Sequence, residues 1–133
     1  MSMLEIARSL PFDSNDFEKL KALAQKELAN QERRPNAQAL ALLSTKENLY
    51  SLFLKDALDP QREEEAKLLN QLSKANDTQI HRILCLWQDG GMDLPSHALR
   101  SMLCSLNPAN GQAGIFVQTA KGSSVIELKN TLS

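Results

Sequence analysis

The chain has 133 residues, a formal net charge of −1 and 42% hydrophobic residues. These values are typical of one globular domain over residues 1–133 and give no sign of a disordered or fibrous protein. The near-neutral charge lacks the basic excess that phosphate contacts require of most nucleic-acid-binding proteins. No apolar run is long enough for a membrane helix, and residues 1–8 do not resemble a signal peptide. We therefore expect a cytoplasmic protein.

Residues 1–58 are interpreted as a helical platform. After a short helix over residues 3–9, an apolar stripe at three-to-four spacing from Phe17 to Leu28 predicts an amphipathic helix, with Asn15 and Glu18 as a capping box. Residues 36–58 are rich in Ala and Leu and are interpreted as one bent helix or two, with a second capping box at residues 44–47.

Residues 59–133 are interpreted as three helices and a hairpin. Asp59 and Pro60 suit the start of a helix over residues 61–74, whose inner stripe would be Ala66, Leu69 and Leu72. The acidic run in its first turns, Glu63 to Glu65, complements the helix dipole. Consecutive side chains on a helix point in different directions, so these three carboxylates are not expected to share a metal ion.

The next two helices are expected at residues 78–88 and 95–106, separated by a turn at Gly90 and Gly91. Two runs rich in β-branched residues then predict a β-hairpin over residues 114–128. The predicted fold is mainly α: a single-domain bundle of five or six helices that closes with a C-terminal β-hairpin. The order of elements in the second half resembles that of a winged helix-turn-helix, and the resemblance is architectural only.

The histidines and cysteines offer a weak metal-binding pattern. His81 and Cys85 are four residues apart and share a helix face in this interpretation, whereas His97 and Cys104 are seven apart and cannot both reach one tetrahedral zinc. There is no pair of cysteines in CxxC spacing, no phosphate-binding glycine loop and no catalytic signature. The sequence predicts no metal site, no cofactor and no catalytic residue.

These observations favour a small non-enzymatic protein that binds another protein or a second copy of itself, as a regulator or adaptor of the inhibitor or chaperone-like kind. The contact residues would lie on a helical surface and on the hairpin, whose strand edges could pair with another strand. They are Arg33, Arg34, Phe116, Gln118 and Lys121.

The alternative is a winged-helix DNA-binding regulator, in which the helix over residues 95–106 enters the major groove. Its contacts would be Arg82, His97, Arg100 and Lys121. Few basic residues support this alternative, because Arg100 is the only fixed positive charge on the proposed recognition helix. A metal- or cysteine-dependent enzyme is the third possibility.

Overall fold

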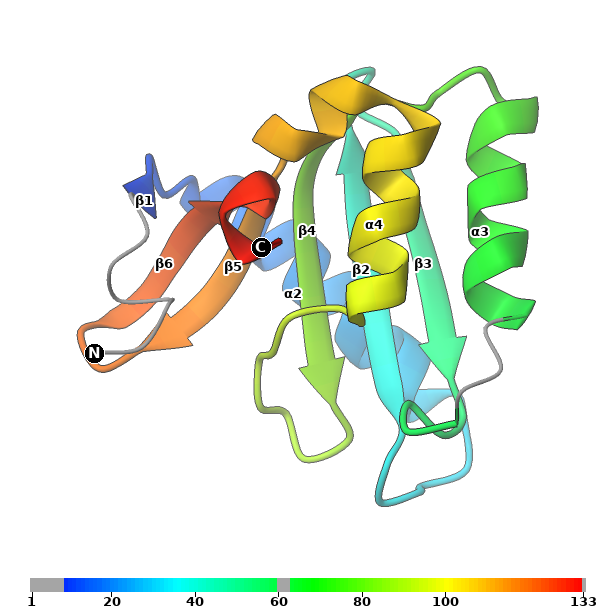
Figure 1. The fold of residues 1–133 in the computed structure, drawn as a ribbon. Helices are drawn as coiled ribbons and strands as arrows, with labels where there is room; N and C mark the ends of the chain where they lie inside the picture. The colour runs from blue at the N-terminus through cyan, green and yellow to red at the C-terminus, as the bar shows by residue number, and fades with distance from the viewer. Residues whose placement is uncertain (1–8, 60–62, 133) are drawn as a thin grey trace.

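The computed structural model describes residues 9–59 and 63–132, which form an α/β fold of three layers (Figure 1). The central layer is a mixed sheet in which the described residues form six strands in the order β1-β6-β5-β4-β2-β3. The strands are β1 (Ser9–Leu10), β2 (Gln38–Ser44), β3 (Leu49–Leu54), β4 (Ile80–Trp87), β5 (Gly114–Thr119) and β6 (Gly122–Glu127). The helices are α2 (Ser14–Ala29), α3 (Glu63–Lys74) and α4 (His97–Leu106), with short 3-10 helices η1 (Pro108–Gln112) and η2 (Leu128–Thr131).

The helices cover the two faces of the sheet. Figure 1 shows α2 behind the sheet and α3 and α4 in front of it. Each face accordingly has its own buried apolar layer: α2 contributes Leu20, Ala24 and Leu28 to one, and Leu68, Leu72, Leu99 and Leu103 from α3 and α4 belong to the other. Among the described residues, no helix is both long and apolar enough to cross a membrane.

The predicted mainly α bundle is wrong. Residues 36–58 contain the antiparallel hairpin of β2 and β3, and residues 78–88 contain the central strand β4. Every residue of β2 is buried, because helices cover both faces of the sheet at this point. The sequence of a strand that is buried on both faces is a continuous apolar run without alternation. Hydrophobic periodicity cannot distinguish such a run from a buried helix.

Other predicted elements are confirmed. The structure has helices at 14–29, 63–74 and 97–106 and a hairpin of β5 and β6. The cap of α2 is Asp13, whose side chain accepts from the backbone N–H groups of Asn15 and Asp16, and not Asn15. Residues 3–8 of the expected first helix lie outside the described residues. The winged-helix order is contradicted, because β4 occupies the place of its second helix.

The ends of four elements meet at one edge of the sheet. β3 and β4 are both antiparallel to β2 and therefore run in the same direction. They end at Leu54 and Trp87, at the lower edge in Figure 1, where α3 and α4 begin. In α/β sheets, ligands bind beyond the carboxyl ends of strands, where helix N-termini also carry partial positive charge. A functional site is therefore expected at this end of the sheet.

Candidate functional site

A buried carboxylate lies where the first turns of α3 and α4 meet. Glu65 has 0% exposure, and its Oε2 accepts a hydrogen bond of 2.7 Å from the Oγ of Ser96. The same hydroxyl accepts a hydrogen bond of 3.0 Å from the backbone N–H of Leu99 and so caps α4. Ser96 thus connects the two helices through one oxygen atom. We call these residues the Glu65–Ser96 site.

A small enclosed space adjoins this pair and is too narrow for a water molecule. Its lining residues are Gln38, Leu40, Leu54, Glu65, Cys85, Pro95, Ser96 and Leu99. Burial raises the pKa of the Cys85 thiol far above its ordinary value, and the nearby carboxylates of Asp93 and Glu65 raise it further. Cys85 is therefore a protonated thiol at neutral pH, whereas a nucleophile or metal ligand must be a thiolate.

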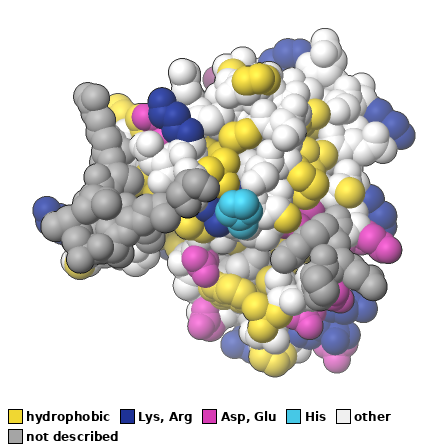
Figure 2. Space-filling model, in the orientation of Figure 1, with side chains coloured by type: hydrophobic (Ala, Val, Ile, Leu, Met, Phe, Trp, Pro, Cys, Tyr) yellow, Lys and Arg dark blue, Asp and Glu magenta, His cyan; other side chains and the backbone are white. Residues whose placement is uncertain are grey.

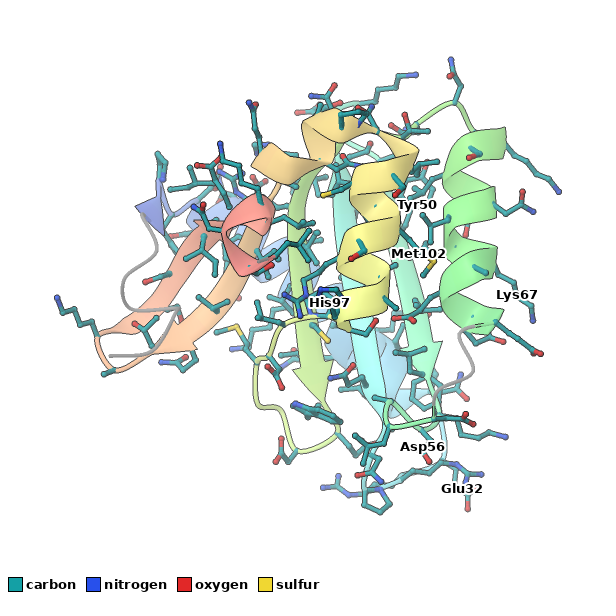
Figure 3. The ribbon with its side chains drawn as sticks, in the orientation of Figure 1. Glu32, Tyr50, Asp56, Lys67, His97 and Met102 are labelled. Carbon is teal, nitrogen blue, oxygen red and sulfur yellow. The ribbon has the colours of Figure 1, made fainter. Side chains whose placement is uncertain are left out.

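Leu54 also lines a larger outer hollow of about 290 Å³, so it adjoins both this hollow and the enclosed space. The other lining residues are Lys55, Asp56, Asp59, Glu63 and Glu64. Figure 3 shows Asp56 just beyond the end of β3, and Figure 2 shows acidic and basic side chains gathered along the lower edge of this face. The rim of the hollow is therefore mainly acidic.

The structure does not bring together the five residues predicted to bind a partner. Arg33 and Arg34 follow α2 and line a separate hollow of about 390 Å³ with Gln88, and Arg34 lies 3.3 Å from Glu32. Phe116 is 0% exposed, with its ring packed against those of Phe12 and Phe17.

Gln118 and Lys121 are exposed near the turn that joins β5 and β6, and Figure 1 shows this turn far from the loop that follows α2. Binding of another protein or of a second copy stays a prediction.

The residues proposed for DNA binding largely serve the fold. Arg82 is 9% exposed, and its Nη1 donates to the backbone carbonyl of His81. Arg100 donates to two backbone carbonyls, those of Pro95 and Thr131, each at 2.9 Å, and burial lowers its pKa. His97 is exposed at the start of α4 (Figure 3).

The histidine–cysteine pattern also separates in space. His81 lies 3.4 Å from the carboxylate of Asp16 on α2, whereas Cys85 belongs to the core under α3 and α4. Cys104 is half-buried, and burial raises the pKa of its thiol as well. Over residues 9–59 and 63–132, the structure shows no group of three His, Cys, Asp or Glu side chains that could hold a metal ion.

Comparison with solved structures identifies the architecture. The fold is that of the cytidine deaminases. The enzyme from Mycobacterium leprae matches with a TM-score of 0.63 and 17% identity over 90% of this chain and 98% of that one. The enzyme from Bacillus anthracis matches with a TM-score of 0.65 and 13% identity over 86% and 85% of the two chains. No protein-family model matches the sequence, and neither does any curated protein.

These matches correct the functional predictions. The structures that this chain resembles are enzymes, and neither a winged-helix DNA binder nor a non-enzymatic regulator or adaptor finds support among them. The prediction that the protein is not an enzyme is contradicted for the same reason. At these identities the likeness establishes the fold alone.

The residues at the site do not fit a cysteine-held zinc. Zinc deaminases bind the metal through the histidine of a His-x-Glu motif, or a cysteine in its place, and through the two cysteines of a Pro-Cys-x-x-Cys motif. Here Pro95 is followed by Ser96, and Leu99 stands at the second cysteine position. No histidine or cysteine stands two residues before any glutamate in the sequence. Leucine has no donor atom, and a neutral serine hydroxyl is not among the usual zinc ligands.

Proposed function

We propose that the chain binds a pyrimidine nucleoside, or a small compound with the same hydrogen-bond pattern, at the Glu65–Ser96 site without cysteine-held zinc. One observation carries the proposal: a fully buried carboxylate, hydrogen-bonded to a half-buried serine hydroxyl, lies at the strand ends and helix N-termini of a cytidine deaminase fold. A cytoplasmic location, expected from the sequence, is part of the same proposal.

The inner residues suit the edge of a nucleobase. The Glu65 carboxylate accepts hydrogen bonds, and the Ser96 oxygen, whose O–H is donated to Glu65, can accept one more. The Gln38 amide both donates and accepts. A site with buried polar groups discriminates strongly against ligands that leave those groups unpaired. Leu54 is half-buried and must move to admit a base, because the enclosed space does not hold even a water molecule.

The outer hollow suits a sugar better than a phosphate. Carboxylates such as those of Asp56 and Glu63 accept hydrogen bonds from ribose hydroxyl groups, as acidic residues do in dinucleotide-binding proteins. Among the described residues, four carboxylates line the hollow, those of Asp56, Asp59, Glu63 and Glu64, together with the single ammonium of Lys55. Lys67 pairs with Glu64 at 3.1 Å, and the rim still has an excess of negative charge. An excess of negative charge repels a phosphate group. We therefore expect a nucleoside to bind more tightly than its monophosphate.

Thermal unfolding with added ligand tests the ligand class. A ligand at 100 times its Kd stabilises a protein by about 2.7 kcal/mol, which raises Tm by roughly 10 °C in a domain of this size. Cytidine or uridine should raise Tm, and their monophosphates should raise it less. In Glu65→Gln the ligand-induced shift should shrink, because the carboxylate is lost, whereas the exposed Glu18→Gln on α2 should keep it. The proposal fails if neither nucleoside raises Tm at millimolar concentration.

The zinc-free part of the proposal has its own assay. Conversion of cytidine to uridine changes the ultraviolet absorbance and can be followed directly, with and without added zinc. We expect no zinc-dependent conversion, since the cysteine ligands are missing. Zinc-dependent turnover by the purified chain would contradict this part and would leave the binding result standing.

A further inference from the structure

We infer that the hydrogen bond between Glu65 and Ser96 joins the first turn of α3 to the start of α4 at the carboxyl ends of β3 and β4, so that the fold is stable without a zinc ion at this place. The inference uses two residues of the proposed nucleoside site, and it would hold for a protein that bound no nucleoside.

Glu65 and Ser96 have the geometry of a strong hydrogen bond. The Oγ–Oε2 distance of 2.7 Å is in the range of charge-assisted hydrogen bonds, and the carboxylate is fully buried. Glu65 also lies in the first turn of α3, where the helix dipole favours a negative charge. Because a buried carboxylate that loses its partners is costly, the bond constrains how α3 and α4 can move relative to each other.

The positions of a metal site are present, but the donor atoms are not. Ser96 and Leu99 stand at the two cysteine positions of the Pro-Cys-x-x-Cys motif, and both line the same enclosed space as Glu65 and Cys85. In a zinc deaminase, these two positions supply two bonds to one ion. Here one of them supplies the hydrogen bond to α3, and the other fills the space with an apolar side chain that is 1% exposed.

Removal of the Ser96 hydroxyl tests whether this hydrogen bond stabilises the packing of α3 against α4. Ser96→Ala should lower Tm by about 3 to 10 °C, because it removes both the helix cap and a hydrogen-bond donor to a buried carboxylate. Ser105→Ala, at an exposed position of the same helix, is the control and should change Tm little. The double variant Ser96→Ala, Glu65→Leu should recover part of the loss, since no carboxylate is left buried. A Ser96→Ala variant as stable as Ser105→Ala would overturn the inference.

Metal content and chelation provide the second test. The purified wild-type chain should contain no stoichiometric zinc, and EDTA should leave its Tm unchanged. Stoichiometric zinc whose removal lowers Tm would refute the inference.

Ser96→Cys combined with Leu99→Cys places two thiolate donors beside Glu65 and Cys85, and this variant should bind about one zinc or cobalt ion per chain and become sensitive to EDTA. A folded double variant that binds neither ion would show that the positions lack the geometry inferred here.

Discussion

The network around Asp77 yields a stability prediction with a definite pH dependence. The Asp77 carboxylate is 2% exposed and accepts hydrogen bonds from Asn48 at 2.9 Å and Tyr50 at 2.8 Å. It thereby joins the turn after α3 to the β2–β3 hairpin. Burial raises the pKa of Asp77, but the hydrogen bonds from Asn48 and Tyr50 outweigh burial and bring the pKa below its ordinary value of 3.8.

Asp77→Asn should therefore destabilise the protein at neutral pH. Hydrogen bonds to a charged group contribute about 1.5 to 3 kcal/mol each, and the substituted amide oxygen still accepts, so the expected loss is about 1 to 3 kcal/mol. Tyr50→Phe removes one bond and should cost less. Urea unfolding followed by the fluorescence of Trp87, the one tryptophan, measures both changes.

The sign of the pH effect follows from the direction of the shift. Because the pKa is lower in the folded state, ionised Asp77 stabilises the fold above its unfolded pKa, and this contribution is lost as the pH falls through the folded pKa. The stability difference between wild type and Asp77→Asn should thus be largest near pH 7 and shrink below about pH 4. A difference that is equal near pH 7 and pH 3 would refute the argument.

Three further substitutions test other contacts by thermal unfolding. Asn110→Ala removes three hydrogen bonds of a fully buried amide and should cost about 3 kcal/mol or more; a loss below about 1 kcal/mol would contradict the network. Gly114→Ala would place a Cβ 2.5 Å from Cγ1 of Val125 and should cost about 1 to 3 kcal/mol, part of which Val125→Ala should restore. Arg100→Ala loses bonds to two backbone carbonyls and should cost about 1 to 3 kcal/mol, and Arg100→Lys should not rescue it, because an ammonium lacks the guanidinium fork.

The elements that the sequence predicted correctly are those with local signals. α2 and α4 each have an apolar stripe on one face only, and Ser96 caps α4 directly. The β5–β6 hairpin combines β-branched residues with a tight turn at Gly122, whose φ of +108° favours glycine. These signals depend on residues close together in the chain, so they can be recognised without knowing the fold.

β2 and β4 could not be recognised in this way. Residues 39–43 of β2 consist of Ala and Leu, which are strong helix formers, and in β4 Ile80, Ile83 and Trp87 fall at helical spacing by coincidence. Their strand conformation comes from tertiary context: each strand is covered on both faces by helices and paired on both edges. Residues distant in sequence provide this context, and it overrides the local propensity.

Glu65 was missed for a related reason. The expected inner stripe was Ala66, Leu69 and Leu72, whereas the buried residues of α3 are Glu65, Leu68 and Leu72. The two sets share Leu72 and differ by one residue at the other two positions. A prediction of the buried helix face from hydrophobicity alone selects the face without a carboxylate. The observed face, which buries Glu65, is stable because Ser96, 31 residues later, supplies the hydrogen bond. Glu63 and Glu64 are exposed as the helix-dipole argument requires, so of three adjacent glutamates the functional candidate is the one that lies on the apolar stripe. A charged residue in phase with the buried leucines of a helix therefore indicates a candidate site from the sequence alone. The residue that pairs with it, here Ser96, can be identified only from the fold.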